Sequence, residues 1–81
     1  MSKPPYRPIS CAFHDRLEAL ATRRKPVLIV FRDWNGQFEQ ITGLIKTWET
    51  RAGEEYLILE SGPDLRLDQL VEVNGVKRSA D

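Results

Sequence analysis

Pro26 divides the sequence into two parts with different hydrophobic patterns. Before it, apolar residues recur at the spacing of one face of a helix. After it, short β-branched and apolar segments alternate with turn residues. Proline disfavours the helical conformation in the residue before it, so a helix that approaches Pro26 must end there. The sequence therefore predicts one N-terminal helix followed by a mainly β domain.

The helix is predicted over residues 11–24, with Ser10 as its N-cap. Three cations are placed in its last turn, where positive charge suits the helix dipole: Arg23, Arg24 and Lys25. The face expected to contact the domain core carries Phe13, Leu17, Leu20, Ala21 and Arg24. Residues 1–9 hold three of the five prolines and are predicted to form an extended arm.

About five short antiparallel strands are predicted between residues 27 and 74. An Asn-Gly pair at 35–36 predicts a hairpin turn. The segment 37–50 is long for one flat strand, and Gly43 marks where it is expected to bend. Such strands suggest a small five-stranded barrel of Sm-like type, capped by the helix, because closure removes exposed sheet edges. An open five-stranded sheet with the helix across one face is the structural alternative.

Length and composition narrow the classes of protein further. A chain of 81 residues forms one domain, here residues 10–75, followed by a tail predicted to be flexible over residues 76–81. Acidic and basic residues balance at 12 each, so the chain has no net charge that would attract nucleic acid or an anionic membrane as a partner. The longest apolar run, residues 27–31, is too short to span a bilayer, and no signal peptide is evident. One cysteine makes no internal disulfide, which indicates a reducing cytoplasm.

The only cysteine and the only histidine, Cys11 and His14, are neighbours on the predicted helix. A nucleophilic cysteine also requires a group that orients the histidine and an oxyanion hole, and the sequence offers neither. With Asp15 the pair provides three metal donors, whereas structural zinc takes four. The sequence therefore predicts no catalytic residue, no metal site and no cofactor. It predicts a half-buried thiol and a surface imidazole.

Two carboxylates lie opposite the apolar face of the predicted helix. Asp15 and Glu18 are three residues apart and are both expected to face solvent. Further acids follow in the strands and turns: Asp33, Glu39, Glu54, Glu55 and Glu60. One interpretation is a solvated polar face. The other is a negatively charged docking surface for a basic partner.

Several segments in this order resemble the Rho-binding antiterminator (Rof) family. They are "YRPISC", "HDRLEALA", "EYLILE" and "LRLDQLVEVNG", which together extend from Tyr6 to Gly75. The resemblance implies an Sm-like barrel with an N-terminal helix, in a bacterial cytoplasmic protein without enzymatic activity. It implies binding to the N-terminal domain of the transcription termination factor Rho, whose basic cleft captures nascent RNA. A protein docked there would exclude RNA and reduce Rho-dependent termination.

The matching positions imply specific contacts with Rho. Asp15 and Glu18 are the principal expected contacts. Their neighbours are expected to add hydrogen bonds or stacking: Tyr6, Arg7, Ser10 and His14. Arg66 and Asp68 also match the family and are expected to form a structural ion pair or a turn contact near the last strand. The family usually has Asp directly after the cysteine, where this chain has Ala12. If that Asp is a helix cap, Ser10 is expected to replace it. If it contacts Rho, weaker affinity is expected for this chain.

An Sm-like RNA-binding protein is the alternative hypothesis. Its basic clusters are "TRRK" and "VKR", and its aromatic residues for base stacking are Trp34, Trp48 and Tyr56. The clusters are short, and the aromatics are not interleaved with them, so direct nucleic-acid binding is the weaker expectation. In isolation the protein is expected to be a monomer, although Sm-like proteins also assemble into rings.

Overall fold

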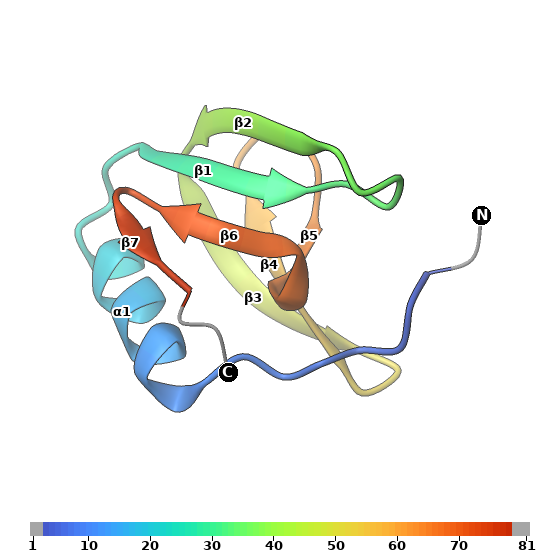
Figure 1. Ribbon diagram of the computed structural model, residues 1–81. Coiled ribbons are helices and arrows are strands. Elements are labelled where there is room, and N and C mark those ends of the chain that lie inside the picture. The colour runs from blue at the N-terminus through green and yellow to red at the C-terminus, as the bar shows by residue number, and fades with distance from the viewer. Residues whose placement is uncertain (1–2, 79–81) are drawn as a thin grey trace.

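The computed structural model describes residues 3–78, in which one α-helix precedes seven short strands (Figure 1). The α-helix is α1 (Cys11–Thr22), and a 3-10 helix, η1, spans Leu67–Gln69. The strands are β1 (Val27–Arg32), β2 (Phe38–Gly43), β3 (Ile45–Arg51), β4 (Glu54–Leu59), β5 (Leu65–Arg66), β6 (Leu70–Val73) and β7 (Val76–Lys77). The predicted mainly β domain with an N-terminal helix is confirmed.

The strands form two antiparallel sheets. One has the order β2-β1-β6-β7 and the other the order β3-β4-β5. The alternative of a single open five-stranded sheet is therefore wrong. The expected five-stranded closed barrel is not shown either, because strand pairing within residues 3–78 does not join the two sheets into a closed ring.

The predicted bend at Gly43 is confirmed, and it divides one long segment between the two sheets. β2 pairs with β1 from Gly43 opposite Val27 to Phe38 opposite Arg32. After Leu44 the chain continues as β3, which pairs with β4 instead. The Glu60 amide donates to the Leu44 carbonyl at 2.8 Å and so satisfies the backbone at the bend.

The tail predicted to begin at residue 76 begins later, because Val76 and Lys77 form β7 against β6. The connection is a two-residue loop, Asn74-Gly75, with φ angles of 52° and 86°. Positive φ at both positions is the requirement of the primed hairpin turns that match strand twist, and Asn-Gly meets it at low cost. The remainder of the predicted tail, residues 79–81, lies outside the described residues.

The helix ends earlier than predicted. Its last residue is Thr22, and Arg23 is the C-cap. Arg24 takes a left-handed conformation with φ of 54°, which turns the chain toward Pro26. The three cations at 23–25 therefore lie after the helix and not in its last turn.

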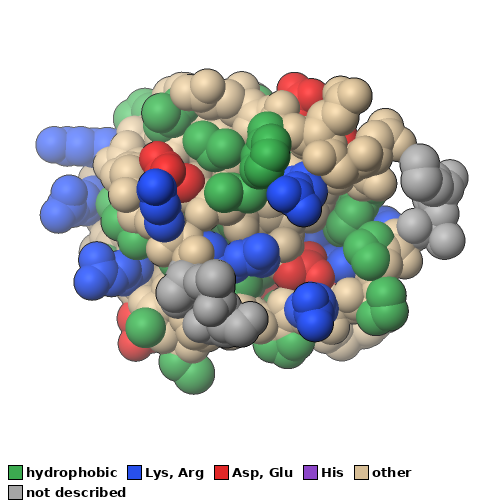
Figure 2. Space-filling model, in the orientation of Figure 1, with side chains coloured by type: hydrophobic (Ala, Val, Ile, Leu, Met, Phe, Trp, Pro, Cys, Tyr) green, Lys and Arg blue, Asp and Glu red, His purple; other side chains and the backbone are tan. Residues whose placement is uncertain are grey.

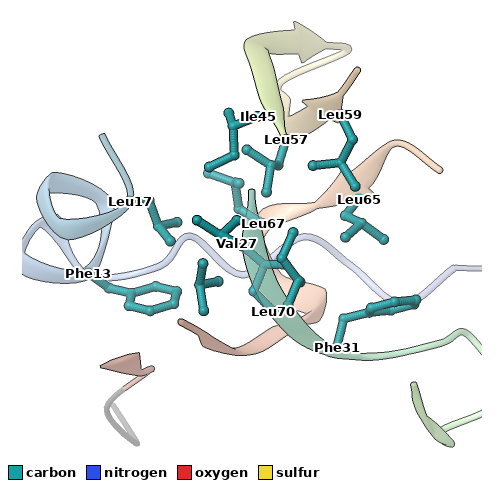
Figure 3. Packing of buried hydrophobic residues seen from close by; sticks show 12 residues of the cluster. Phe13, Leu17, Val27, Phe31, Ile45, Leu57, Leu59, Leu65, Leu67 and Leu70 are labelled. Carbon is teal, nitrogen blue, oxygen red and sulfur yellow. The ribbon is translucent and has the colours of Figure 1, made fainter. Parts of the chain in front are cut away.

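The core forms between the helix and both sheets. Figure 3 shows Phe13 and Leu17 pointing from α1 into the interior, where Leu17 has no exposed surface. Leu20 and Ala21 pack against the core while remaining partly exposed, whereas Arg24 is exposed. Because Phe13 and Leu17 are buried, the opposite side of α1 faces solvent. Within residues 3–78, no helix has the length and apolar character required to cross a membrane.

Candidate partner-binding surface

Three carboxylates from two elements form one exposed surface. Asp15 and Glu18 are exposed on the side of α1 that does not contact the core, as predicted. Glu55 of β4 joins them through His14, whose two ring nitrogens lie 3.8 Å from Glu18 Oε2 and 3.8 Å from Glu55 Oε2. Asp15, Glu18 and Glu55 are called the acidic helix surface below.

Among the described residues, these three carboxylates have no lysine or arginine partner. Within residues 3–78, no Lys or Arg nitrogen lies within 4.0 Å of any of them. Some acids elsewhere are paired, for example where Arg51 bonds Glu49 at 2.6 Å and Asp64 at 2.8 Å, whereas others such as Glu39 and Glu60 are single exposed carboxylates. Carboxylates without a local partner retain their capacity to accept charge-assisted hydrogen bonds from another molecule.

His14 connects the helix to the second sheet. Its ring stacks on Trp48 of β3, with centroids 5.3 Å apart and planes inclined by 30°. Only 27% of its side chain is exposed, so the expected surface imidazole is in fact half-buried. His14 therefore covers part of the Trp48 ring. His14 thus lies between Glu18 and Glu55, 3.8 Å from a carboxylate oxygen of each.

Ser10 forms the predicted N-cap. Its Oγ accepts from the Phe13 amide at 3.2 Å, and its carbonyl accepts from the His14 amide at 3.0 Å. The hydroxyl that was expected to contact a partner is thus used within the chain. Ala12 follows without a polar side chain, so the first turn of α1 contains no acidic residue.

Ser10→Ala is expected to lower the free energy of unfolding by about 1 kcal/mol, because the Phe13 amide loses its acceptor. Urea denaturation measures the change. Ser10→Asp retains an acceptor at the same position and is the matched control. Equal destabilisation by the two variants would contradict a capping role.

The N-terminal arm runs along the domain before it enters α1 (Figure 1). The Arg7 amide donates to Asp68 Oδ2 at 3.0 Å. Tyr6 is half-buried, and its phenol lies near enough to Glu55 and Asp68 for both carboxylates to affect its ionisation. The arm thus brings Tyr6 to the border of the acidic helix surface, while Arg7 lies beside Asp68.

Arg66 fastens this arm to the domain. Its side chain is fully buried, and it pairs with Asp68 through Nε at 2.7 Å and Nη2 at 2.9 Å. Nη2 also donates to the Pro4 carbonyl at 2.9 Å, and the guanidinium lies 4.7 Å from the Trp34 ring centroid. Hydrogen bonding to Asp68 raises the pKa of Arg66. The predicted structural ion pair is confirmed, and it has the further role of holding the arm.

Tyr6→Phe is expected to leave the free energy of unfolding unchanged or to raise it by up to about 1 kcal/mol. The Tyr6 hydroxyl is buried without a hydrogen-bond partner among residues 3–78. Burial raises the pKa of Tyr6 above its ordinary value of 10.0, and the charges of Glu55 and Asp68 add to this. A weaker backbone contact at Glu55 acts in the opposite direction.

The folded state therefore retains the Tyr6 proton at a pH where the unfolded chain releases it, and stability falls as pH rises above about 10. Tyr6→Phe is expected to remove this part of the decline. Denaturation curves of the wild type and the variant on both sides of pH 10 provide the measurement. Parallel declines in the two proteins would show that Tyr6 contributes nothing.

Cys11 is exposed, which corrects the expected half-buried thiol. It does not belong to the one group of possible metal ligands among the described residues, which consists of His14, Asp15 and Glu18 with ligand atoms within 4.8 Å of one another. Three donors on an exposed helix are fewer than structural zinc requires. We interpret this group as part of the acidic helix surface.

A cleft of about 610 Å³ lies between the arm, the β1–β2 loop and η1. Its basic lining residues are Arg7, Arg32, Arg66 and Arg78, and Trp34 contributes an aromatic ring. The basic clusters expected from the sequence to bind RNA lie at 23–25 and 77–78, and the cleft as a whole was not predicted. No local motif marks it, because its residues come from four separated segments.

In comparisons with known proteins, no protein-family model matches the chain, and no curated protein or solved structure matches it significantly. The role of its surfaces must therefore be inferred from their own residues.

Proposed function

We propose that this protein is a non-enzymatic regulator that binds the N-terminal domain of the transcription termination factor Rho through the acidic helix surface. Binding there blocks the loading of RNA and reduces Rho-dependent termination in the bacterial cytoplasm. The protein acts as a monomer. The proposal joins the sequence resemblance to the Rof family with the geometry of α1 and β4.

The observation that carries the proposal is the set of three carboxylates that have no lysine or arginine nitrogen within 4.0 Å in residues 3–78. Asp15, Glu18 and Glu55 belong to two elements, and His14 lies between two of them at 3.8 Å on each side. Such a surface presents several acceptors at once to arginine and lysine side chains. In a chain with no net charge, this local concentration favours a basic protein surface as the partner.

The arrangement of strands supports an Sm-like fold. One long segment bends at Gly43 and contributes β2 to one sheet and β3 to the other. At the other side, only the three-residue η1 separates β5 of one sheet from β6 of the other. Two short connections between the sheets bring their strands side by side at two places, as a small barrel also requires.

The mechanism is competition for the same cations. Nucleic-acid phosphates are bound by lysine and arginine side chains, and much of the affinity comes from this electrostatic contact. Carboxylates that engage those side chains leave fewer of them for RNA. Because α1 is fixed to the core by Phe13 and Leu17, its carboxylates are presented without a large ordering cost.

The test is a titration of this protein into Rho bound to a fluorescent cytidine-rich RNA, together with a titration into Rho alone. We expect the RNA anisotropy to fall and direct binding to Rho to be observed. Both effects should weaken as salt is raised, because the contacts are ionic. Retention of RNA on Rho, with no binding of this protein to Rho, would overturn the proposal.

Ala12→Asp is expected to tighten binding to Rho, because it adds a carboxylate to a first turn that has none. It is also expected to raise the free energy of unfolding by about 0.3–1 kcal/mol through the helix dipole. The two effects are separated by measuring affinity for Rho and urea denaturation on the same preparation. Ala19→Asp, an exposed substitution later in α1, is the matched control. Unchanged affinity in a stabilised Ala12→Asp variant would assign position 12 to capping alone.

A further inference from the structure

The cleft beside the N-terminal arm is lined by basic side chains that have no carboxylate partner among residues 3–78, although Arg78 Nη1 donates to the Asp68 carbonyl at 2.6 Å. Arg7, Arg32 and Arg78 line it and are exposed, and no carboxylate within residues 3–78 lies within 4.0 Å of their guanidinium groups. Figure 2 shows basic side chains spaced around the middle of this face of the molecule. Three cations converge here in a chain whose overall charge is zero.

The two acids of the cleft are already engaged. Asp33 Oδ1 accepts from the Asn35 and Gln37 amides at 2.9 Å each and shapes the β1–β2 loop. Asp68 is paired with the buried Arg66. The exposed guanidinium groups are therefore the charges that the cleft presents to a ligand, and the ligand they fit is an anion.

The aromatic rings beside these cations indicate which kind of anion the cleft would bind. Trp34 lines the cleft and is half-buried, with the Arg66 guanidinium 4.7 Å from its ring centroid. Phe38 is 60% exposed, and the Arg32 guanidinium lies 4.8 Å from its ring centroid. Phe38 lies beside the cleft and not in its lining, so Trp34 is the aromatic ring that the cleft itself presents. An aromatic ring next to cations without a carboxylate partner is a combination on which an unpaired base stacks while its phosphates are neutralised.

We propose that this cleft binds single-stranded nucleic acid. Arg7, Arg32 and Arg78 contact successive phosphates, and Trp34 provides a plane for one base. A volume of about 610 Å³ accommodates a nucleotide unit and lies within the range of small-ligand sites. An acidic peptide would satisfy the cations but would leave the aromatic planes without a matching partner.

The site is independent of the acidic helix surface. The two share no residue. Of the cleft arginines, Arg7 and Arg32 lie outside the two basic clusters that the sequence suggested for RNA, whereas Arg78 belongs to the second of them, VKR. The proposal thus goes beyond the binding of Rho, and it can fail or hold without that function. A binding assay without Rho keeps the two tests apart.

The test is fluorescence anisotropy of single-stranded RNA and DNA oligonucleotides of about eight nucleotides, titrated with the full chain. The variant is Arg7→Gln with Arg32→Gln and Arg78→Gln. The matched control is Arg23→Gln with Arg24→Gln and Lys25→Gln, which removes the same charge outside the cleft. Circular dichroism checks that both variants remain folded.

We expect the wild type to bind at low salt and to weaken about 20-fold when salt rises from about 50 to about 200 mM, as three phosphate contacts to a single strand predict. The cleft variant should bind at least about tenfold more weakly and with a smaller salt dependence, while the control stays within about threefold. Comparison of the two affinities shows whether the cleft prefers RNA or DNA. A preference for either one supports the proposal.

A second measurement uses Trp48→Phe, which leaves Trp34 as the only tryptophan of the chain. Quenching of Trp34 fluorescence by the oligonucleotide is expected if a base stacks on it. Any of four results would overturn the proposal: no binding at low salt, equal loss in both triple variants, no quenching, or equally tight binding of an oligoglutamate peptide.

Discussion

Arg66→Ala is expected to lower the free energy of unfolding by about 3–5 kcal/mol, because it removes one partner of a buried ion pair. Asp68 and Glu54 would then lose their guanidinium, and Asp68 would be left nearly buried with a charge. The arm would lose the hydrogen bond to the Pro4 carbonyl as well. A domain this small has a total free energy of unfolding of about 5 kcal/mol, so the Arg66→Ala substitution is expected to remove most of it.

Arg51→Ala is the matched control for this prediction. Arg51 also pairs with two carboxylates, Glu49 and Asp64, but 46% of its side chain is exposed. Exposed ion pairs contribute little because water and salt screen them. Urea denaturation of the two variants compares a buried and an exposed pair of similar geometry. Similar losses from both would show that the burial of Arg66 is not what matters.

Asp15→Lys with Glu18→Lys is expected to weaken binding to Rho by more than about 100-fold while circular dichroism stays native. Both side chains are exposed, so the fold does not depend on them. Reversal of two charges places lysines against the basic cleft of Rho and converts attraction into repulsion. The affinity for Rho is measured at constant ionic strength, since the contacts are salt-dependent.

The control for the double substitution reverses the same number of charges elsewhere. Glu39→Lys with Glu60→Lys changes two exposed acids, one in β2 and one after β4. If binding depends only on net charge, both double variants lose affinity equally. If it depends on the acidic helix surface, the control retains it. An unchanged affinity in folded Asp15→Lys/Glu18→Lys protein would place the interface elsewhere.

The helix and the bend were accessible from the sequence because each depends on a local rule. The spacing of Phe13 and Leu17 predicted the buried face of α1, and Gly43 predicted the bend between β2 and β3. The strand β7 was missed although its signal was present: Asn74-Gly75 is the same turn signal that predicted the first hairpin. The end of α1 was placed too late, since the chain leaves the helix at Arg23 and uses a left-handed Arg24 before Pro26.

The candidate sites were less accessible, because they depend on contacts between distant segments. The exposure of Asp15 and Glu18 followed from helical geometry. The contribution of Glu55 depends on the packing of His14 against Trp48, which no local pattern predicts. The cleft depends on Arg66, which holds the arm beside the β1–β2 loop and thereby brings Arg7 near Arg32. Its basic side chains are too far apart in sequence to form a motif.

The most direct measurement is chemical-shift mapping of the isotope-labelled protein with and without the N-terminal domain of Rho. The account predicts that the largest shift changes occur at the amides of Asp15, Glu18 and Glu55 and at the His14 ring. Amides of the β1–β2 loop should change little, because that loop lines the cleft and is not part of the acidic helix surface. Shift changes concentrated in that loop, or none at saturating Rho domain, would contradict the account.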